Sequence, residues 1–148
     1  MNELQDLYRE VILDHNRRPR NFGELEDPDR IVEGVNPLCG DRMTLYVKLD
    51  GDTVQDIRFK GTGCAISVAS SSLMTEKVKG ASLQESLKLF EKVHDMLTAA
   101  DYDDSADLED LDKLAALSGV REYPSRVKCA SLSWHALKSA LTSVDDKI

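Results

Sequence analysis

Three cysteines are the residues of this chain with the clearest capacity for chemistry. Cys39 lies in the segment Asn-Pro-Leu-Cys-Gly-Asp, Cys64 follows Gly-Thr-Gly, and Cys129 follows Arg-Val-Lys. Asp41 stands two residues after Cys39, and the glycine at position 40 lets the backbone turn both side chains toward one point. Three thiolates and a carboxylate can fill a tetrahedral zinc site or hold a small iron–sulfur cluster. These four residues therefore predict a metal or cluster site.

The expected surroundings of these cysteines favour the thiolate form. Cys64 is expected where a strand ends and a helix begins, and there the unpaired backbone N–H groups and the helix dipole lower the pKa of a thiol. Cys129 is expected near the start of the last helix, with Arg126 and Lys128 beside it in the sequence. The thiolate is the form that binds metal and attacks sulfur, so both chemistries suit these positions.

The spacing of the cysteines is weaker evidence than their surroundings. They are 25 and 65 residues apart, which is unlike the paired C-x-x-C pattern of zinc fingers, so folding has to bring three separate loops together. Each cysteine alone is equally well explained as a small buried apolar side chain. Glycine or charge lies beside all three, and this favours the metal or cluster site without excluding the other interpretation.

Composition limits the class of protein. The 148 residues suit one domain, residues 1–148, and 41% hydrophobic with 31% charged residues is typical of a globular chain. A net charge of −8 argues against nucleic acid as the main partner. No apolar run approaches the roughly 20 residues that span a membrane, and the charged N-terminus does not look like a secretory signal. An odd number of cysteines then indicates a reducing, cytoplasmic setting.

Hydrophobic periodicity gives the expected fold. Apolar residues recur at helical spacing in some segments and alternate with polar residues in others. Their order predicts an α+β fold in which about five helices pack with a small antiparallel sheet of about three strands. Helices are expected at 3–15, 65–78, 83–99, about 107–117 and 126–142, and strands at 30–35, 42–49 and 53–60.

Several residues predict where these elements turn or end. Asp50-Gly51 is a hairpin signal, and Ser82 with Glu85 forms a capping-box pattern. Gly119 is expected to end the short helix that precedes the last one. His15 and His94 fall in predicted helices, so we expect packing or surface roles for them. Trp134, Leu137 and Leu141 are candidate core residues.

An acidic segment marks the second half of the chain. Residues 101–112 carry seven acidic side chains and no basic one. A solvated surface is the plainer interpretation, and a docking surface for a partner protein is the sharper one.

The motifs together resemble the U-type iron–sulfur cluster assembly proteins, the IscU/NifU N-terminal-like family. The likeness runs through nearly the whole chain, and the resemblance implies an IscU-like fold. It rests on Leu7-Tyr8-Arg9, Asp14-His15, Pro19-Arg20-Asn21, Asn36-Pro37-x-Cys39-Gly40-Asp41, Gly61-x-Gly63-Cys64-Ala65-Ile66-Ser67, Ala69-Ser70-Ser71, Arg126-x-x-Cys129-Ala130 and Trp134.

Two departures from the IscU pattern, Lys128 and an acidic insert, point to the SufU branch, and a third, the absence of a chaperone-docking motif, argues against recognition by the usual chaperone. IscU-type scaffolds have histidine directly before the third cysteine, whereas this chain has Lys128. An acidic insert at about 101–119 separates the second and third cysteine regions. The chaperone-docking motif Leu-Pro-Pro-Val-Lys is absent, and residues 121–126 stand in its place. The resemblance therefore implies a zinc protein that accepts persulfide sulfur from a SufS-type cysteine desulfurase and serves downstream Suf scaffold proteins.

The same resemblance implies a role for each site residue. Cys39, Asp41, Cys64 and Cys129 would be the zinc ligands, and Cys39 would be displaced by a partner group and accept the sulfur. Arg126 would assist by pairing with Asp41 or with the freed thiolate, although a plain surface charge explains it equally well. Such a protein is a co-substrate or activator of the desulfurase, for which the label sulfurtransferase is defensible, and whether it is an enzyme in its own right stays open.

Two other functions use the same residues. The first is a scaffold that assembles a transient [2Fe–2S] cluster on the three cysteines, with Asp41 as a labile fourth ligand. The second is a structural zinc module that only recruits partners. Lys128 and the acidic insert favour the sulfur acceptor over the scaffold. The structural module differs in predicting that loss of any ligand unfolds the domain and that no persulfide forms.

Overall fold

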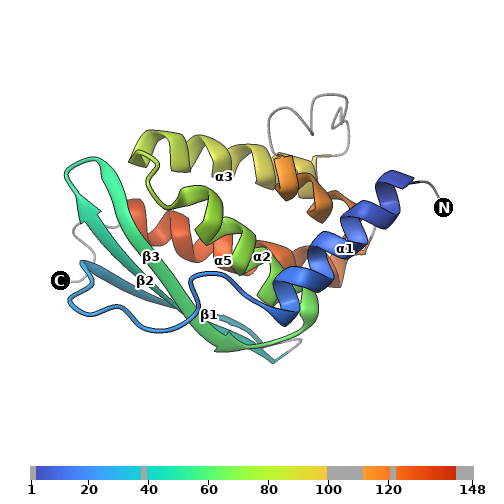
Figure 1. Ribbon diagram of the computed structural model, residues 1–148, viewed down its shortest axis with the longest axis horizontal. Helices are drawn as coiled ribbons and strands as arrows, with labels where there is room; N and C mark the ends of the chain where they lie inside the picture. The colour runs from blue at the N-terminus through green and yellow to red at the C-terminus, as the bar shows by residue number, and fades with distance from the viewer. Residues whose placement is uncertain (1–2, 38–39, 100–111, 121–122, 143–148) are drawn as a thin grey trace.

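A small sheet lies on one side of the molecule and helices cover one of its faces, as the computed structural model shows (Figure 1). The structure describes residues 3–37, 40–99, 112–120 and 123–142. Its antiparallel sheet has the order β1-β2-β3, and α2 and α5 pack on it. The predicted α+β fold is confirmed. The elements are α1 (Glu3–Arg17), β1 (Arg30–Asn36), β2 (Asp41–Asp50), β3 (Thr53–Thr62), α2 (Ala65–Val78), α3 (Leu83–Thr98), the 3₁₀ helix η2 (Asp112–Val120) and α5 (Pro124–Thr142).

The strands β2 and β3 form the predicted hairpin. Asp50 pairs with Thr53, and Gly51 has a φ of 59°, a left-handed conformation that glycine adopts without steric cost. Along β2, alternate side chains enter the core, as the period of a half-buried strand requires. The buried members of this set are Met43, Leu45 and Val47.

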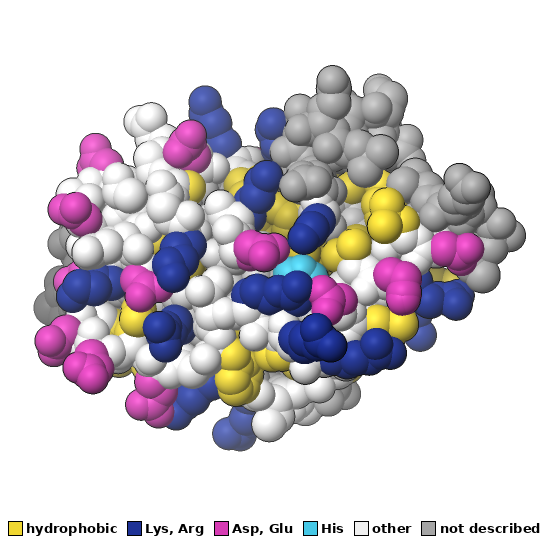
Figure 2. Space-filling view, viewed as in Figure 1, with side chains coloured by type: hydrophobic (Ala, Val, Ile, Leu, Met, Phe, Trp, Pro, Cys, Tyr) yellow, Lys and Arg dark blue, Asp and Glu magenta, His cyan; other side chains and the backbone are white. Residues whose placement is uncertain are grey.

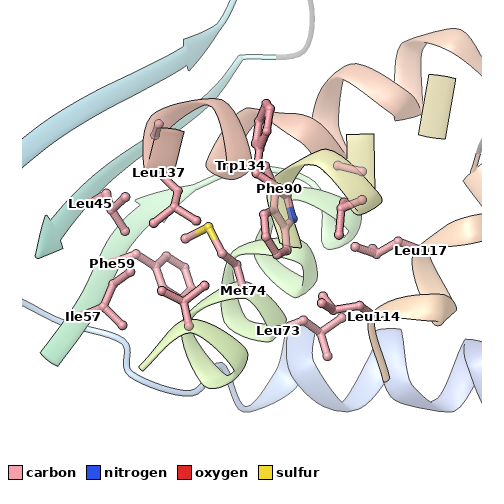
Figure 3. Packing of buried hydrophobic residues seen from close by; sticks show 14 of the residues in the cluster. Leu45, Ile57, Phe59, Leu73, Met74, Phe90, Leu114, Leu117, Trp134 and Leu137 are labelled. Carbon is pink, nitrogen blue, oxygen red and sulfur yellow. The ribbon is translucent and has the colours of Figure 1, made fainter. Parts of the chain in front are cut away.

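The core lies between the sheet and the helices, and each layer contributes large side chains to it. Figure 3 shows Leu45, Ile57 and Phe59 from the sheet facing Met74 of α2 and Leu137 of α5. All of these side chains are almost fully buried. The predicted core residues Trp134, Leu137 and Leu141 are confirmed as buried members of this cluster.

Most predicted helix boundaries agree with the structure. The capping box is present, because the Ser82 side chain accepts from the Glu85 N–H and the Glu85 carboxylate accepts from the Ser82 N–H. Pro124 is the first residue of α5 and so needs no N–H partner there.

The prediction for the short helix was wrong in two respects. The described part is a 3₁₀ helix, and it continues through Gly119 to Val120. Four consecutive side chains of η2, residues 114–117, are buried against the other helices. Burial on all sides is a tertiary effect that propensity cannot predict. Residues 101–111, the first part of the acidic insert, lie outside the described residues.

The visible face of the molecule carries a mixed surface. Figure 2 shows basic and acidic side chains interspersed over it, with hydrophobic side chains in small separate patches. Among the described residues, no helix is both long enough and apolar enough to cross a membrane.

A buried polar cluster joins α1 to α2. His15 is 1% exposed. Its Nδ1 lies 2.7 Å from the Ser72 hydroxyl, which also accepts from the Arg20 N–H at 2.8 Å. The tautomer of the neutral ring sets which group donates in the contact with Nδ1, because the hydroxyl oxygen can accept a second hydrogen bond as well as donate one. The other ring nitrogen, Nε2, is buried and lies 3.8 Å from a carboxylate oxygen of Glu76. His15 thus packs as a neutral residue, in line with the sequence-based expectation.

The pKa of His15 makes folding sensitive to acid. Burial lowers this pKa below the ordinary value of 6.5, and the charges of Arg20 and Lys113 lower it further, while Glu76 and Asp14 oppose them. The stabilisation from neutral His15 is present above pH 6.5 and is lost as the pH falls through 6.5 toward the lower pKa of the folded state.

We predict that His15→Gln lowers the free energy of unfolding at neutral pH and also reduces its loss on acidification. Urea unfolding of both proteins, followed from about pH 8 to about pH 5 across the titration range of histidine, measures this. An unchanged pH dependence in the variant would contradict the assignment. His135, whose pKa is also lowered by burial, contributes to the pH dependence that remains.

Candidate metal centre

Three predicted ligands, far apart in the sequence, meet at one end of the sheet. Asp41 is the first residue of β2, Cys64 is the N-cap of α2, and Cys129 lies in the second turn of α5. One carboxylate oxygen and the two sulfurs all lie within 4.8 Å of one another. The fold therefore brings together the three separate segments that the sequence analysis required.

The carboxylate of Asp41 lies at the centre of this group. It is 0% exposed. Its Oδ1 accepts a hydrogen bond from the Cys64 N–H at 2.9 Å, and its Oδ2 lies 4.0 Å from the Cys64 sulfur. Among the described residues, no lysine, arginine or histidine forms an ion pair with it. A buried carboxylate needs compensating charge, and a metal cation between this oxygen and the two sulfurs would supply it.

Two glycines allow the chain to pass close to the start of β2, where Asp41 lies. A Cβ atom at Gly63 would lie 2.7 Å from Asp41 Oδ1. At Gly61, φ is 156° and a Cβ would lie 2.1 Å from the Arg42 carbonyl oxygen. Side chains at these positions would push β3 away from β2 just where Cys64 is placed. The Gly-x-Gly-Cys segment is thus a steric requirement of the site.

Cys129 is positioned by a link between α2 and α5. The Ser70 hydroxyl donates to the Ala130 carbonyl oxygen at 2.5 Å and accepts from Trp134 Nε1 at 3.1 Å. Both bonds are buried, where a hydrogen bond is costly to lose. Since Ala130 directly follows Cys129, Ser70 fixes the height of that cysteine on α5 relative to α2.

The turn between β1 and β2 has the glycine conformation that the sequence predicts. Gly40 has a φ of 74° and donates its N–H to the Asn36 carbonyl oxygen at 2.9 Å. Asn36 and Asp41 are paired across the two strands. Cys39, the fourth predicted ligand, belongs to this turn in the sequence but lies outside the described residues.

The two basic residues near Cys129 point to solvent. Arg126 and Lys128 are both exposed, and the Arg126 guanidinium lies over the Tyr123 ring, 5.0 Å from its centroid. Arg126 also borders a hollow of about 360 Å³ between α1, η2 and α5. An assisting role for Arg126 stays a prediction.

The donor set fits zinc. Ligand atoms around a tetrahedral zinc ion with two thiolates and a carboxylate are about 3.5–3.8 Å apart, given metal–ligand distances of about 2.0–2.3 Å. The present spacing, within 4.8 Å, needs only side-chain adjustments of about an ångström. Two sulfurs and one carboxylate oxygen also match the ligand preference of zinc better than that of calcium or magnesium.

Known proteins that are similar to this chain belong to one family. Residues 7–130 match the model of the NifU-like N-terminal domain family. The chain belongs to this family. It is 48% identical over 138 residues to the zinc-dependent sulfurtransferase SufU of Bacillus subtilis. The aligned residues cover 93% of this chain and 91% of that protein. It is also 40% identical to the iron–sulfur cluster assembly scaffold protein IscU of Streptococcus pyogenes, over 95% of this chain and 86% of that one.

Solved structures share the fold of this family member. A SUF-system protein from Fervidobacterium islandicum superposes with a TM-score of 0.82 at 36% identity, covering 89% of this chain and 94% of that one. The N-terminal part of a NifU-like protein from Brucella abortus superposes with a TM-score of 0.76 at 26% identity, over 99% of this chain and all of that one. The predicted IscU-like fold and the predicted resemblance are confirmed.

Sequence reasoning did not identify two residues that support the site. Ser70 was part of a recognised motif, but its partners Ala130 and Trp134 lie in another helix. Asn36 was likewise part of a motif, yet its side chain is buried beside Cys129. Both are polar residues that the fold buries. Their burial depends on tertiary packing, so the sequence alone does not reveal it.

We predict that Gly63→Ala weakens zinc binding by about 10- to 100-fold, the effect typical of disturbing the surroundings of a metal ligand. The added methyl group would displace the Asp41 carboxylate. Competition with a chromogenic chelator measures the affinity. Gly119→Ala is the control, because a Cβ there meets no atom within 4 Å. Equal affinity in the two variants would contradict a ligand role for Asp41.

We also predict that Ser70→Ala lowers the free energy of unfolding by about 1–3 kcal/mol, because two buried polar groups lose their partner. Ser71→Ala is the matched control. Its hydroxyl is equally buried, and among the described residues it donates to the Ser67 carbonyl oxygen within the same helix. Urea unfolding compares them. Equal losses in both variants would show that Ser70 does not hold α2 and α5 together.

Proposed function

We propose that this protein accepts persulfide sulfur from a SufS-type cysteine desulfurase and passes it to downstream Suf scaffold proteins for iron–sulfur cluster assembly in the cytoplasm. The observation that carries the proposal is the convergence of the Asp41 carboxylate with the sulfurs of Cys64 and Cys129. The name of the Bacillus subtilis relative, a zinc-dependent sulfurtransferase, supports it. The cysteine desulfurase is a partner that the whole family implies, and the SufS type is our finer assignment.

Zinc, when bound, holds cysteine side chains as thiolates at neutral pH. In our proposal Asp41, Cys64 and Cys129 are permanent ligands and Cys39 is the exchangeable one. The first three belong to a strand end and two helices. Hydrogen bonds link Cys64 to Asp41 and Ser70 of α2 to Ala130, the residue after Cys129. Cys39 is adjacent to Gly40, whose positive φ closes a turn at the edge of the site. A glycine next to Cys39 in the sequence suits a ligand that is exchanged.

The transfer itself needs one thiolate from each protein. The Cys39 thiolate attacks the outer sulfur of the persulfide on the desulfurase cysteine. The sulfur–sulfur bond of that persulfide breaks, and the desulfurase cysteine leaves as a thiolate. A new sulfur–sulfur bond forms on Cys39, so atoms, electrons and charge balance without any oxidant. The protein thus acts as the co-substrate of the desulfurase.

A scaffold for a transient [2Fe–2S] cluster is the second candidate, since the relative from Streptococcus pyogenes is named as a scaffold. The same cysteines would hold the cluster. IscU-type scaffolds have a histidine where Lys128 stands, and the Lys128 side chain is exposed. Lysine is protonated at neutral pH and has no lone pair to offer a metal. This residue favours the sulfur acceptor.

We predict that desulfurase and cysteine load one extra sulfur atom onto Cys39. Mass spectrometry of the alkylated peptide containing Cys39 measures this. Cys39→Ser should abolish the gain while zinc binding, measured separately, is weakened but retained through the other three ligands. Sulfur acceptance by Cys39→Ser, or a persulfide on Cys64 or Cys129 in the wild-type protein, would contradict the proposal.

A further inference from the structure

Asn36 occupies an unusual place between the metal centre and the turn that carries Cys39. It is the last residue of β1, its side chain is only 6% exposed, and it pairs with Asp41 across the sheet. Its Nδ2 lies 3.9 Å from the sulfur of Cys129, 93 positions away in the sequence. An amide N–H group at the buried end of a strand is therefore directed at one of the ligand sulfurs.

The backbone of Asn36 serves the other side of the site. Its carbonyl oxygen accepts the Gly40 N–H at 2.9 Å, which closes the turn between β1 and β2. Cys39 lies within this turn in the sequence, between Asn36 and Asp41. One residue thus contacts the turn of the exchangeable ligand through its backbone and a permanent ligand through its side chain.

Elementary electrostatics explains what the side-chain contact would do. An N–H group aimed at a thiolate sulfur stabilises its negative charge and fixes its direction, as the partners of metal ligands generally do. At Cys64 the backbone N–H is donated to the Asp41 carboxylate instead, which ties that residue to β2. Cys129 comes from α5, so a link from β1 connects it to the strands that carry the rest of the site.

We propose that Asn36 is a positioning residue that holds the Cys129 sulfur in the ligand set by donating a side-chain hydrogen bond to it. The proposal rests on the function proposed above. It assigns Asn36 a role in that function: it keeps zinc bound at the moment when Cys39 leaves to accept sulfur.

The test measures zinc retention in purified holoprotein. Asn36→Ala removes the donor, and Asn36→Leu removes it while keeping a side chain of similar size. We expect both variants to lose zinc to excess chelator about 10- to 100-fold faster than the wild type, the usual effect of removing a partner of a metal ligand. In a Cys39→Ser background, where Cys129 is one of three ligands, the effect should be at least as large.

Ser133→Ala is the matched control. Its hydroxyl is buried on the same helix as Cys129 and has no hydrogen-bond partner among the described residues. We expect its zinc loss to equal that of the wild type. Urea unfolding of each zinc-loaded variant shows whether the fold is kept.

The outcomes separate the two proposals. Wild-type zinc retention in Asn36→Leu would overturn the role of Asn36, because side-chain volume alone would then explain the site. Wild-type retention in Asn36→Ala would overturn it as well. If the wild-type protein itself bound no zinc, the proposed function would fail before Asn36 came into question.

Discussion

A carboxylate buried in the interior is the constraint on which the rest of this structure depends. Asp41 is 0% exposed, and no basic side chain among the described residues forms an ion pair with it. Burying an ionised carboxylate without compensation costs several kcal/mol. The Cys64 N–H supplies one hydrogen bond, and a cation shared with the two sulfurs would supply the remaining charge. The stability of the fold and the binding of metal are therefore coupled at this residue.

The elements around Asp41 can be understood as a means of bringing its partners close. Gly61 pairs with Met43 in β2, and Gly63 lies against the Asp41 carboxylate. Only glycine fits at these distances. From there the chain passes directly into α2 with Cys64 at the N-cap. Ser70 then links α2 to α5 beside Cys129. These contacts hold Asp41, Cys64 and Cys129 together, which is the arrangement that the proposed role of three permanent ligands requires.

Local patterns were sufficient to predict most of the fold. Alternation along β2, the Asp50-Gly51 turn and the Ser82–Glu85 capping box each depend on neighbouring residues, and each is confirmed. The short helix at about 107–117 was expected, but its 3₁₀ form and its end at Val120, beyond Gly119, were not, because local propensity does not record burial against other elements.

The residues of the site also fall into those that local sequence predicts and those that depend on tertiary contacts. The type and flanking residues of Cys39, Asp41, Cys64 and Cys129 indicated metal chemistry, and three of the four now lie together. The roles of Asn36 and Ser70 could not be predicted, because each acts across the structure on α5. Long-range hydrogen bonds of buried polar side chains leave no periodic trace in a sequence.

The most direct measurement is the metal content and visible spectrum of anaerobically purified protein, combined with zinc X-ray absorption to identify the ligand atoms. A sulfur acceptor built on Asp41 and three cysteines should contain one zinc per chain, be colourless and show mixed sulfur and oxygen coordination. Iron with labile sulfide and a charge-transfer spectrum would contradict this and show that the three cysteines hold a cluster despite Lys128.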